Sequence, residues 1–164
     1  MRWFAILLTA IAVAVVGGRG VLQSAPSTAG GTNATVDRVT DGDTVRLSGL
    51  GRTRLIGIDT PEVYGGVQCY GREASAFAKR VLRPGTRVRY KLGVESRDRY
   101  GRALAYVWLA DGRFFNLMLA EQGYAKQLTI PPNVEYADRF RRAVAQARAA
   151  NRGLWSAGTC AGRR

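Results

Sequence analysis

Two short acidic segments of the chain carry residue types that bind hard metal ions. Residues 41–44 are Asp-Gly-Asp-Thr and residues 58–62 are Ile-Asp-Thr-Pro-Glu, and together they hold four of the 12 acidic residues. Carboxylate and carbonyl oxygens suit Ca²⁺, Mg²⁺ or Mn²⁺. Each segment alone is more typical of an ordinary turn or loop, but both border apolar stretches, residues 45–47 and 55–58, so a folded sheet can bring them together. An oxygen-only metal site on a basic chain indicates phosphodiester chemistry.

The composition excludes several kinds of catalytic site. The chain has no histidine, which removes the usual general base, the commonest zinc ligand and every Ser-His-Asp or Cys-His arrangement. Its 25 Lys and Arg residues against 12 Asp and Glu give a formal net charge of +13. Such a charge favours polyanionic partners, whether nucleic acid, an anionic membrane surface or a cell-wall polymer. Catalysis must therefore use carboxylates, arginines and, where present, a metal.

The first 29 residues are typical of a secretory signal peptide or a retained N-terminal anchor. Arg2 precedes an apolar run over residues 3–16, which is short for a membrane span, and Ser-Thr-Ala at residues 27–29 offers a cleavage site. We therefore expect an exported protein, either secreted or held in the cell envelope. The remaining chain is predicted to form a linker at residues 30–34, a single domain at residues 35–157 and a C-terminal tail at residues 158–164.

The chain contains two cysteines, Cys69 and Cys160. In an exported protein an isolated pair of cysteines usually forms a disulfide. The alternative is two reduced and unrelated thiols. A disulfide would join the end of the chain to the segment that follows Glu62.

Alternating and helical patterns of apolar residues predict five strands and three helices. Asp-Gly and Gly-rich turns separate the strands, and Gly or Pro residues end the helices. One helix between the third and fourth strands and two at the end favour an α+β fold, a five-stranded OB-fold β-barrel with three α-helices. A mixed sheet-and-helix sandwich is the alternative. The expected strands span residues 36–39, 44–47, 52–58, 87–92 and 103–109, and the expected helices span residues 73–82, 115–122 and 133–151.

Two arginines occupy positions that distinguish them from solvated surface arginines. Arg54 shares a strand face with Ile56 and Ile58, so we expect it to point inward or to be paired. Arg102 begins the apolar strand at residues 103–109. Two guanidinium groups beside a metal could bind a phosphodiester bidentately and stabilise the extra negative charge of a five-coordinate phosphorus.

Four motifs together resemble those of the thermonuclease (staphylococcal nuclease-like) family. The resemblance spans about residues 35–155 and implies a five-stranded barrel with three helices. It also implies a Ca²⁺-dependent endonuclease that acts on DNA and RNA, with single strands favoured, and leaves 3′-phosphate ends. No protein partner is implied, so we expect a monomer. In the family's order the motifs are residues 41–45 (Asp-Gly-Asp-Thr-Val), 54–62 (Arg-Leu-Ile-Gly-Ile-Asp-Thr-Pro-Glu), 70–74 (Tyr-Gly-Arg-Glu-Ala) and 98–106 (Asp-Arg-Tyr-Gly-Arg-Ala-Leu-Ala-Tyr).

The resemblance also implies roles for individual residues. The family's calcium ligands match Asp43, Asp59 and the Thr60 carbonyl, and an acid that supports the metal site matches Asp41. The two arginines that bind the phosphate match Arg54 and Arg102. The carboxylate that orients or activates the attacking water matches Glu62, and an aromatic residue that contacts the nucleotide matches Tyr100.

The chain departs from the family in two places. After Lys126 the family often has tyrosines that pack on the nucleotide, whereas residues 127–132 are Gln-Leu-Thr-Ile-Pro-Pro, so base stacking there should be weaker. Residues 63–69 lack the lysine-rich loop of some relatives, which suggests a shorter and stiffer rim. The main rival interpretation is a barrel that binds nucleic acid without cleaving it. A basic envelope protein that binds anionic polymers is a third, but it gives no reason for the acidic residues.

Overall fold

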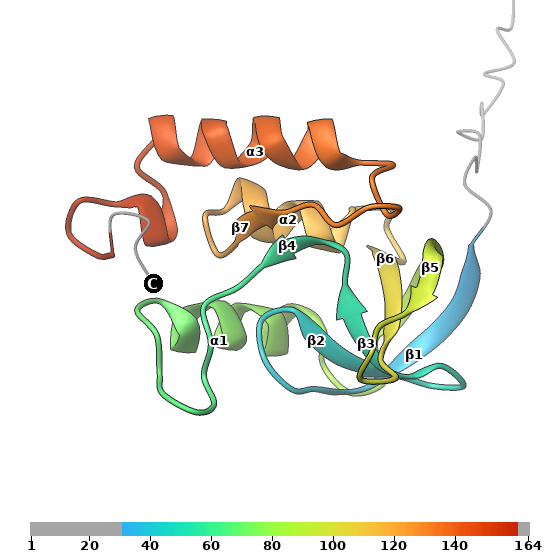
Figure 1. The fold of residues 1–164 in the computed structure, drawn as a ribbon. Helices are drawn as coiled ribbons and strands as arrows, with labels where there is room; N and C mark the ends of the chain where they lie inside the picture. Colours follow the sequence, from blue (N-terminus) through green and yellow to red (C-terminus); the bar gives the residue numbers. More distant parts are fainter. Residues whose placement is uncertain (1–30, 161–164) are drawn as a thin grey trace, which may run out of the picture.

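Five strands close into a barrel in the computed structural model, which describes residues 31–160. The order around the barrel is β1-β2-β3-β6-β5, and β5 pairs again with β1. Neighbouring strands are antiparallel except β3 and β6, which run parallel. The barrel strands gather at one side of the molecule and α1 lies at the other (Figure 1). The strands are β1 (Thr32–Val39), β2 (Thr44–Leu47), β3 (Gly51–Leu55), β5 (Arg87–Arg97) and β6 (Ala103–Leu109).

Alternation along the strands determines which side chains fill the barrel. On β2, Val45 and Leu47 are buried, whereas Arg46 between them is exposed. Burial of each large apolar side chain contributes roughly 2 kcal/mol to stability. A shift of one residue in the strand register would exchange these side chains with Arg46, so the register is strongly specified.

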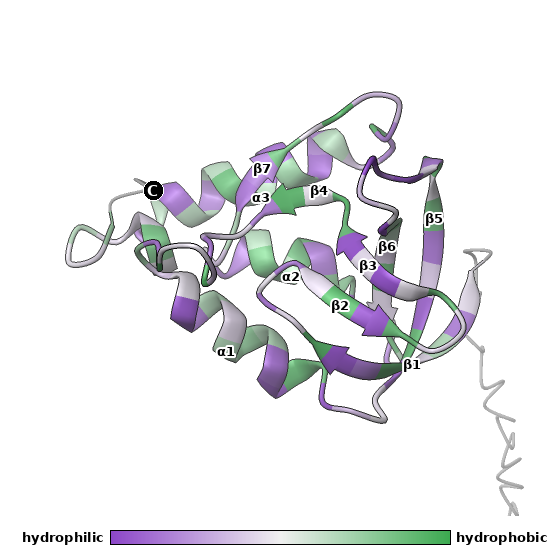
Figure 2. Ribbon diagram, turned by 60° about the horizontal axis from the view of Figure 1, so that its bottom comes forward, coloured by the Kyte–Doolittle hydropathy of each residue, from purple (hydrophilic) through white to green (hydrophobic). Residues whose placement is uncertain are grey.

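Helices cover the barrel with their apolar faces. On α1, Ala74, Phe77 and Ala78 are buried at helical spacing, and Figure 2 shows hydrophobic and hydrophilic bands along this helix. α2 lies between α3 and the barrel (Figure 1). Among the described residues, no helix is both long enough and apolar enough to span a membrane. The helices are α1 (Gly71–Val81), α2 (Phe115–Glu121), α3 (Ala137–Ala149) and the 3₁₀ helix η1 (Gly153–Trp155).

The predicted five-stranded OB-fold barrel with three helices is confirmed, but the third strand differs from its prediction. The single strand expected over residues 52–58 is divided into β3 and β4 (Gly57–Asp59), and β4 pairs with β7 (Lys126–Leu128) outside the barrel. Gly57 has a φ of 89°, and a Cβ at this position would overlap the Phe140 ring. Glycine therefore permits both the left-handed backbone and the close packing that turn the chain out of the barrel.

The third helix begins later than its predicted start at residue 133. Asn133 accepts a hydrogen bond from the Glu95 N–H at 3.0 Å and donates one to the Glu95 carbonyl at 2.9 Å. These bonds hold Asn133 against β5, so α3 begins only at Ala137.

The first strand begins earlier than predicted. Residues 32–34, expected to belong to a linker at residues 30–34, lie in β1, where Thr32 pairs with Tyr90 and Ala34 with Val88. The linker prediction is wrong for these three residues, because their partner strand is distant in sequence and local composition does not reveal the pairing. The predicted leader at residues 1–29 lies outside the described residues, as do residues 161–164 of the predicted tail.

Cys69 and Cys160 form the predicted disulfide, with their Cα atoms 5.8 Å apart and a sequence separation of 91. The bridge joins the segment before α1 to the segment after η1. The end of the described chain is thereby attached to the loop that follows Glu62.

Replacing both cysteines, Cys69→Ser with Cys160→Ser, should lower the free energy of unfolding by about 3 kcal/mol, because the bridge closes a long loop in the unfolded chain. Urea unfolding followed by circular dichroism measures this change. Reduced wild-type protein is the matched control and should unfold with the variant. An unfolding midpoint equal to that of the oxidised protein would contradict the prediction.

Candidate active site

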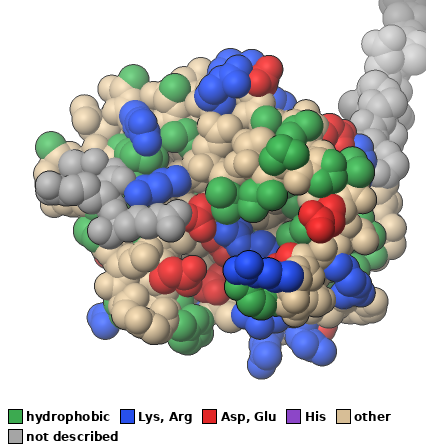
Figure 3. Space-filling model, in the orientation of Figure 1, with side chains coloured by type: hydrophobic (Ala, Val, Ile, Leu, Met, Phe, Trp, Pro, Cys, Tyr) green, Lys and Arg blue, Asp and Glu red, His purple; other side chains and the backbone are tan. Residues whose placement is uncertain are grey.

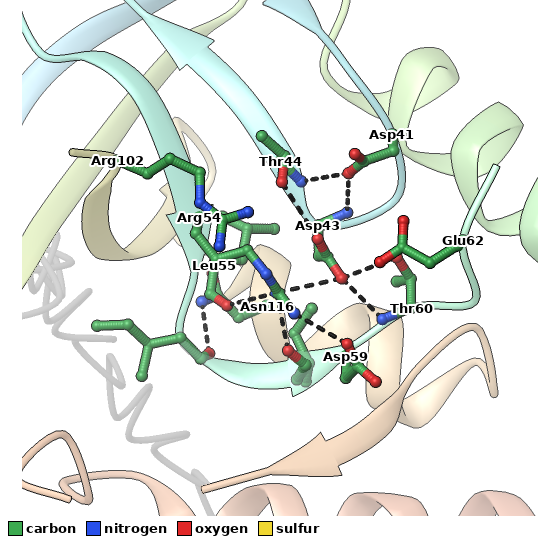
Figure 4. Close-up of polar contacts among 12 residues, drawn as sticks. Asp41, Asp43, Thr44, Arg54, Leu55, Asp59, Thr60, Glu62, Arg102 and Asn116 are labelled. Atoms are coloured by element: carbon green, nitrogen blue, oxygen red, sulfur yellow. Dashed lines mark hydrogen bonds and ion pairs between the residues drawn. The ribbon is translucent and has the colours of Figure 1, made fainter. Parts of the chain in front are cut away.

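One guanidinium group joins the two acidic segments. Arg54, on β3, places Nη1 3.1 Å from Asp43 Oδ2 and Nη2 3.0 Å from Asp59 Oδ1. The three side chains are only 12%, 9% and 13% exposed, in that order. Nη1 also donates to the carbonyls of Leu55 and Ile58 at 3.1 and 2.9 Å (Figure 4). Two acids that are distant in sequence therefore meet at one buried cation.

Asp43 also draws the second acidic segment onto the first. Its Oδ2 accepts hydrogen bonds from the Thr60 N–H at 2.8 Å and from Thr60 Oγ1 at 2.9 Å. A Cβ at Gly42 would lie 2.6 Å from Thr60 Oγ1, so this approach requires a residue without a side chain. Thr60 is thus buried beside Asp43.

Asp41 stabilises the turn that presents Asp43. Its Oδ1 accepts hydrogen bonds from the N–H groups of Asp43 at 3.1 Å and Thr44 at 2.7 Å. This is the Asx-turn pattern, in which a side chain replaces a backbone acceptor. Burial, together with the nearby Asp43 carboxylate, raises the pKa of Asp41 above its ordinary value.

Asn116 fixes the backbone where β3 gives way to β4. This α2 residue is completely buried, and its Nδ2 donates to the carbonyls of Ile56 at 2.9 Å and Ala105 at 3.1 Å. Its Oδ1 accepts from the Val107 N–H at 2.9 Å. Asn116 was not predicted from the sequence, where its signal is a polar residue on an otherwise apolar helix face.

Asp98 holds the second predicted arginine. Its Oδ1 accepts from the N–H groups of Tyr100 at 3.0 Å and Arg102 at 2.9 Å, and its Oδ2 accepts from Arg102 Nε at 2.7 Å. Burial acts to raise the pKa of Asp98, but the hydrogen bonds from Arg102 and Tyr100 outweigh it, so this pKa lies below its ordinary value. Within residues 31–160 the Arg102 side chain hydrogen-bonds only through Nε, which leaves its terminal amino groups available to a ligand.

The contact of Asp98 with Arg102 was also not predicted from the sequence. The signal was an acid four residues before Arg102, across a turn that contains Gly101. Gly101 adopts a φ of 74°, so the turn folds Arg102 back onto Asp98.

Arg54 and Arg102 line the same cavity, which has a volume of about 460 Å³. Leu104 and Leu128 contribute apolar walls, and the Tyr100 ring, which is 66% exposed, lies 5.5 Å from the Arg102 guanidinium carbon. Figure 3 shows acidic and basic side chains meeting in a hollow near the middle of this face. The cavity can therefore hold an anion against two guanidinium groups and a planar group against an aromatic or apolar wall.

Glu62 is exposed and points toward Asp43 (Figure 4). Its N–H donates to Gln68 Oε1 at 3.0 Å, and its carbonyl accepts from the Gln68 N–H at 2.9 Å. This reciprocal pair closes the loop at residues 63–67 and fixes the backbone that carries the carboxylate. Gln68 was also missed, because its role depends on the shape of the loop.

The predicted metal ligands form a donor set that fits a hard cation. Among residues 31–160 no group of three or more His, Cys, Asp and Glu side chains is placed to hold a metal ion. The predicted set consists of two carboxylates, Asp43 and Asp59, and the Thr60 carbonyl. Water molecules can complete the shell of oxygen ligands, because Ca²⁺ binds mixed carboxylate, carbonyl and water oxygens. Both carboxylates already lie within hydrogen-bonding distance of one cationic group, that of Arg54.

The structure brings some of the predicted catalytic and metal-site residues into direct contact, and others lie beside them. Direct contacts join the first acidic segment, the second acidic segment and one arginine, and the other arginine lies across the shared cavity. The residues in contact are Asp41, Asp43, Asp59, Thr60 and Arg54, while Glu62 lies beside them and Arg102 and Tyr100 form a second contact pair.

Comparisons with known proteins agree on one family. The sequence model of the family described as "Staphylococcal nuclease homologue" matches residues 52–157. The chain is 38% identical over 161 residues to a thermonuclease of Staphylococcus intermedius, and the match covers 92% of this chain and 95% of the relative. It is also 38% identical over 163 residues to a thermonuclease of Staphylococcus hyicus, with the same coverage of 92% and 95%. It is 37% identical over 145 residues to endonuclease YhcR of Bacillus subtilis (strain 168), and this match covers 80% of this chain and 12% of that relative.

Asp98→Asn should lower the free energy of unfolding by about 1 kcal/mol at pH 7, because it removes a partly exposed, charge-assisted bond to Arg102. Since folding lowers the pKa of Asp98, its contribution is present above the unfolded pKa of about 4 and is lost as the pH falls through the folded pKa. Urea unfolding at pH 7 and near pH 3 should show a larger difference at pH 7. Asp111→Asn, which disrupts the exposed pair with Arg113, is the control and should change stability little; an equal loss at both pH values for Asp98→Asn would refute the assignment.

Proposed function

Because the chain belongs to the staphylococcal nuclease family, we propose that it is an endonuclease that hydrolyses phosphodiester bonds of nucleic acids. The observation that supports this function most directly is the convergence of Asp43 and Asp59 on Arg54, at the edge of a cavity that Arg102 also lines. Basic groups that can bind a phosphate and acids that can hold a cation thus occupy one site.

The finer assignment is a Ca²⁺-dependent enzyme that acts on DNA and RNA, favours single strands and leaves 3′-phosphate ends. Its support is family membership and the names thermonuclease and endonuclease of the relatives. The leader-like residues 1–29 support export, with the protein either secreted or kept in the cell envelope by a retained anchor. We propose a monomer, because one chain carries every residue of the predicted set.

Arg54 and Arg102 bind the phosphate in this proposal. The backbone carbonyls of Leu55 and Ile58 hold the Arg54 guanidinium, and Asp98 holds Arg102 through Nε. Because both guanidinium groups are held before the substrate arrives, they can stabilise the charge that develops on the phosphoryl oxygens without reorganising. Their planar donors match the geometry of two phosphate oxygens.

Asp43, Asp59 and the Thr60 carbonyl would hold the Ca²⁺ ion. When bound, the ion supplies Lewis-acid stabilisation of the negatively charged phosphoryl group. The contribution of the chain is to deliver two carboxylates to one point, since Thr60 and Arg54 hold Asp43 while Arg54 holds Asp59.

Glu62 is the general base of the proposal. Its carboxylate is exposed to water and points toward the acids, and Gln68 fixes its backbone. A carboxylate in this position can accept a hydrogen bond or a proton from a water molecule that attacks the phosphorus in line. A barrel that only binds nucleic acid would have no use for this carboxylate, and this argues for the enzyme over its rival.

The cavity beside Arg102 would hold the nucleoside attached to the scissile phosphate. Tyr100 offers an exposed ring, while Leu128 and Ile130 belong to the segment after Lys126, where the family often has tyrosines. Stacking of bases on aromatic rings is stronger than contact with aliphatic side chains. We therefore expect weak base stacking in this cavity.

Wild-type protein should digest single-stranded DNA when Ca²⁺ is added and stop when EGTA removes it. Glu62→Gln should slow the digestion by about 100-fold or more, because an amide cannot accept the proton of the attacking water. Glu73→Gln, a neutralised exposed acid on α1, is the matched control and should digest at the wild-type rate. If wild-type protein binds the DNA but does not cleave it at any Ca²⁺ concentration, the non-catalytic barrel is the better interpretation.

The two arginines should differ in their effect on stability but not on cleavage. Arg54→Ala and Arg102→Ala should each slow cleavage by about 100-fold through loss of a transition-state donor. Only Arg54→Ala should lower stability by about 3 kcal/mol in EDTA, because it leaves Asp43 and Asp59 without their shared cation. Thermal unfolding with and without Ca²⁺ measures this, and Ca²⁺ should restore more stability to Arg54→Ala than to Arg102→Ala. An identical Ca²⁺ response in both variants would count against a cation site at Asp43 and Asp59.

A further inference from the structure

A second groove lies beside Glu62, between α1 and the loop at residues 63–67, and it has a volume of about 390 Å³. It shares no lining residue with the cavity of Arg54 and Arg102. The cavity is lined by the β5–β6 loop, whereas the groove is lined by α1, which lies apart from that loop in Figure 1. The lining residues of the groove are Val63, Tyr64, Val67, Arg72, Ser75, Ala76 and Lys79.

We propose that this groove binds a second nucleotide of a single-stranded substrate, on the side of Glu62 opposite to the Tyr100 cavity. The inference rests on the proposed nuclease function and adds a substrate class to it, namely strands long enough to occupy both sides of the scissile phosphate.

One wall of the groove is cationic. Arg72 and Lys79 lie seven residues apart on α1, so they share the helix face that also presents Ser75 and Ala76. Both cations are exposed, and among the described residues none that lines the groove is acidic. A backbone phosphate can therefore meet positive charge in the groove, where the carboxylate of the neighbouring Glu62 is not part of the lining.

The other wall is aromatic and apolar. Tyr64 is 62% exposed, although its hydroxyl donates to the Thr40 carbonyl at 3.2 Å and so anchors the residue next to the Asp41 turn. Val67, 54% exposed, continues the apolar surface of the loop. An exposed ring opposite two cations is the combination that binds single strands without sequence preference, because every base can stack on a ring.

The groove is also well placed relative to the reaction. Val63 and Tyr64 directly follow Glu62, and the loop they begin is closed by Gln68 and attached to Cys160 through the adjacent Cys69. A strand whose scissile phosphate lies at Arg54 and Glu62 can thus extend in one direction toward Tyr100 and in the other toward Tyr64.

Steady-state kinetics with two substrates test the proposal. One is a twelve-residue oligothymidylate, and the other is a nitrophenyl ester of thymidine monophosphate, whose single nucleoside the Tyr100 cavity accommodates. Tyr64→Ala and the double variant Arg72→Ala/Lys79→Ala should each raise KM for the oligonucleotide by about tenfold. They should leave its kcat and the kinetics of the ester within about twofold. The double variant should also weaken the dependence of the oligonucleotide's KM on salt, with a change in the logarithmic slope of about one unit for two lost cations.

Arg80→Ala removes one exposed α1 cation that does not line the groove, and it serves as the control for loss of a cation from this helix. An oligonucleotide KM that is unchanged in the double variant, or raised equally by Arg80→Ala, would overturn the proposal. If the wild-type protein cleaves neither substrate, the nuclease function fails, and fluorescence anisotropy of labelled oligothymidylate still tests the groove. Weaker binding by the double variant than by Arg80→Ala would then support the groove alone, and equal binding would reject it.

Discussion

The Arg54 guanidinium neutralises two nearly buried carboxylates that would otherwise repel each other. A buried charge without a partner costs several kcal/mol, so the Arg54 guanidinium between Asp43 and Asp59 lowers the cost of placing the two carboxylates close together. The same guanidinium donates to the Leu55 and Ile58 carbonyls, on either side of the point where the chain leaves the barrel. One side chain therefore stabilises both the charges of the site and the backbone that presents them.

This arrangement separates long-range attraction from local chemistry. The net charge of +13 attracts a polyanion from a distance, whereas the acids lie in a small cluster that salt screens little because it is buried. Further cationic groups line the two hollows, Arg102 the cavity and Arg72 with Lys79 the groove. A strand held by both sets would place its phosphate over the acids, so the basic surface offsets the repulsion that the carboxylates exert.

Much of the fold was predictable because its signals are local. Alternation on β2 and the Asp-Gly turn before it depend on neighbouring residues, and both lead to the observed hairpin. The single strand predicted over residues 52–58 was wrong, because the break at Gly57 results from packing against Phe140, which follows 83 residues later. β7 and the late start of α3 were missed for the same reason: pairing with β4 and hydrogen bonding of Asn133 to Glu95 are contacts between distant segments.

The sequence by itself determined which chemical groups are present: oxygen ligands, guanidinium groups, a carboxylate base candidate, one pair of cysteines and no histidine. It also determined their order along the chain, and this order carried the resemblance to the family. Only the tertiary structure decided that Arg54 lies between Asp43 and Asp59, that Asp98 holds Arg102, and that Asn116 secures the strand break across 60 residues of sequence. The physical reason is that side-chain chemistry and periodicity are properties of short segments, whereas hydrogen bonds and ion pairs depend on distances that exist only after the barrel closes.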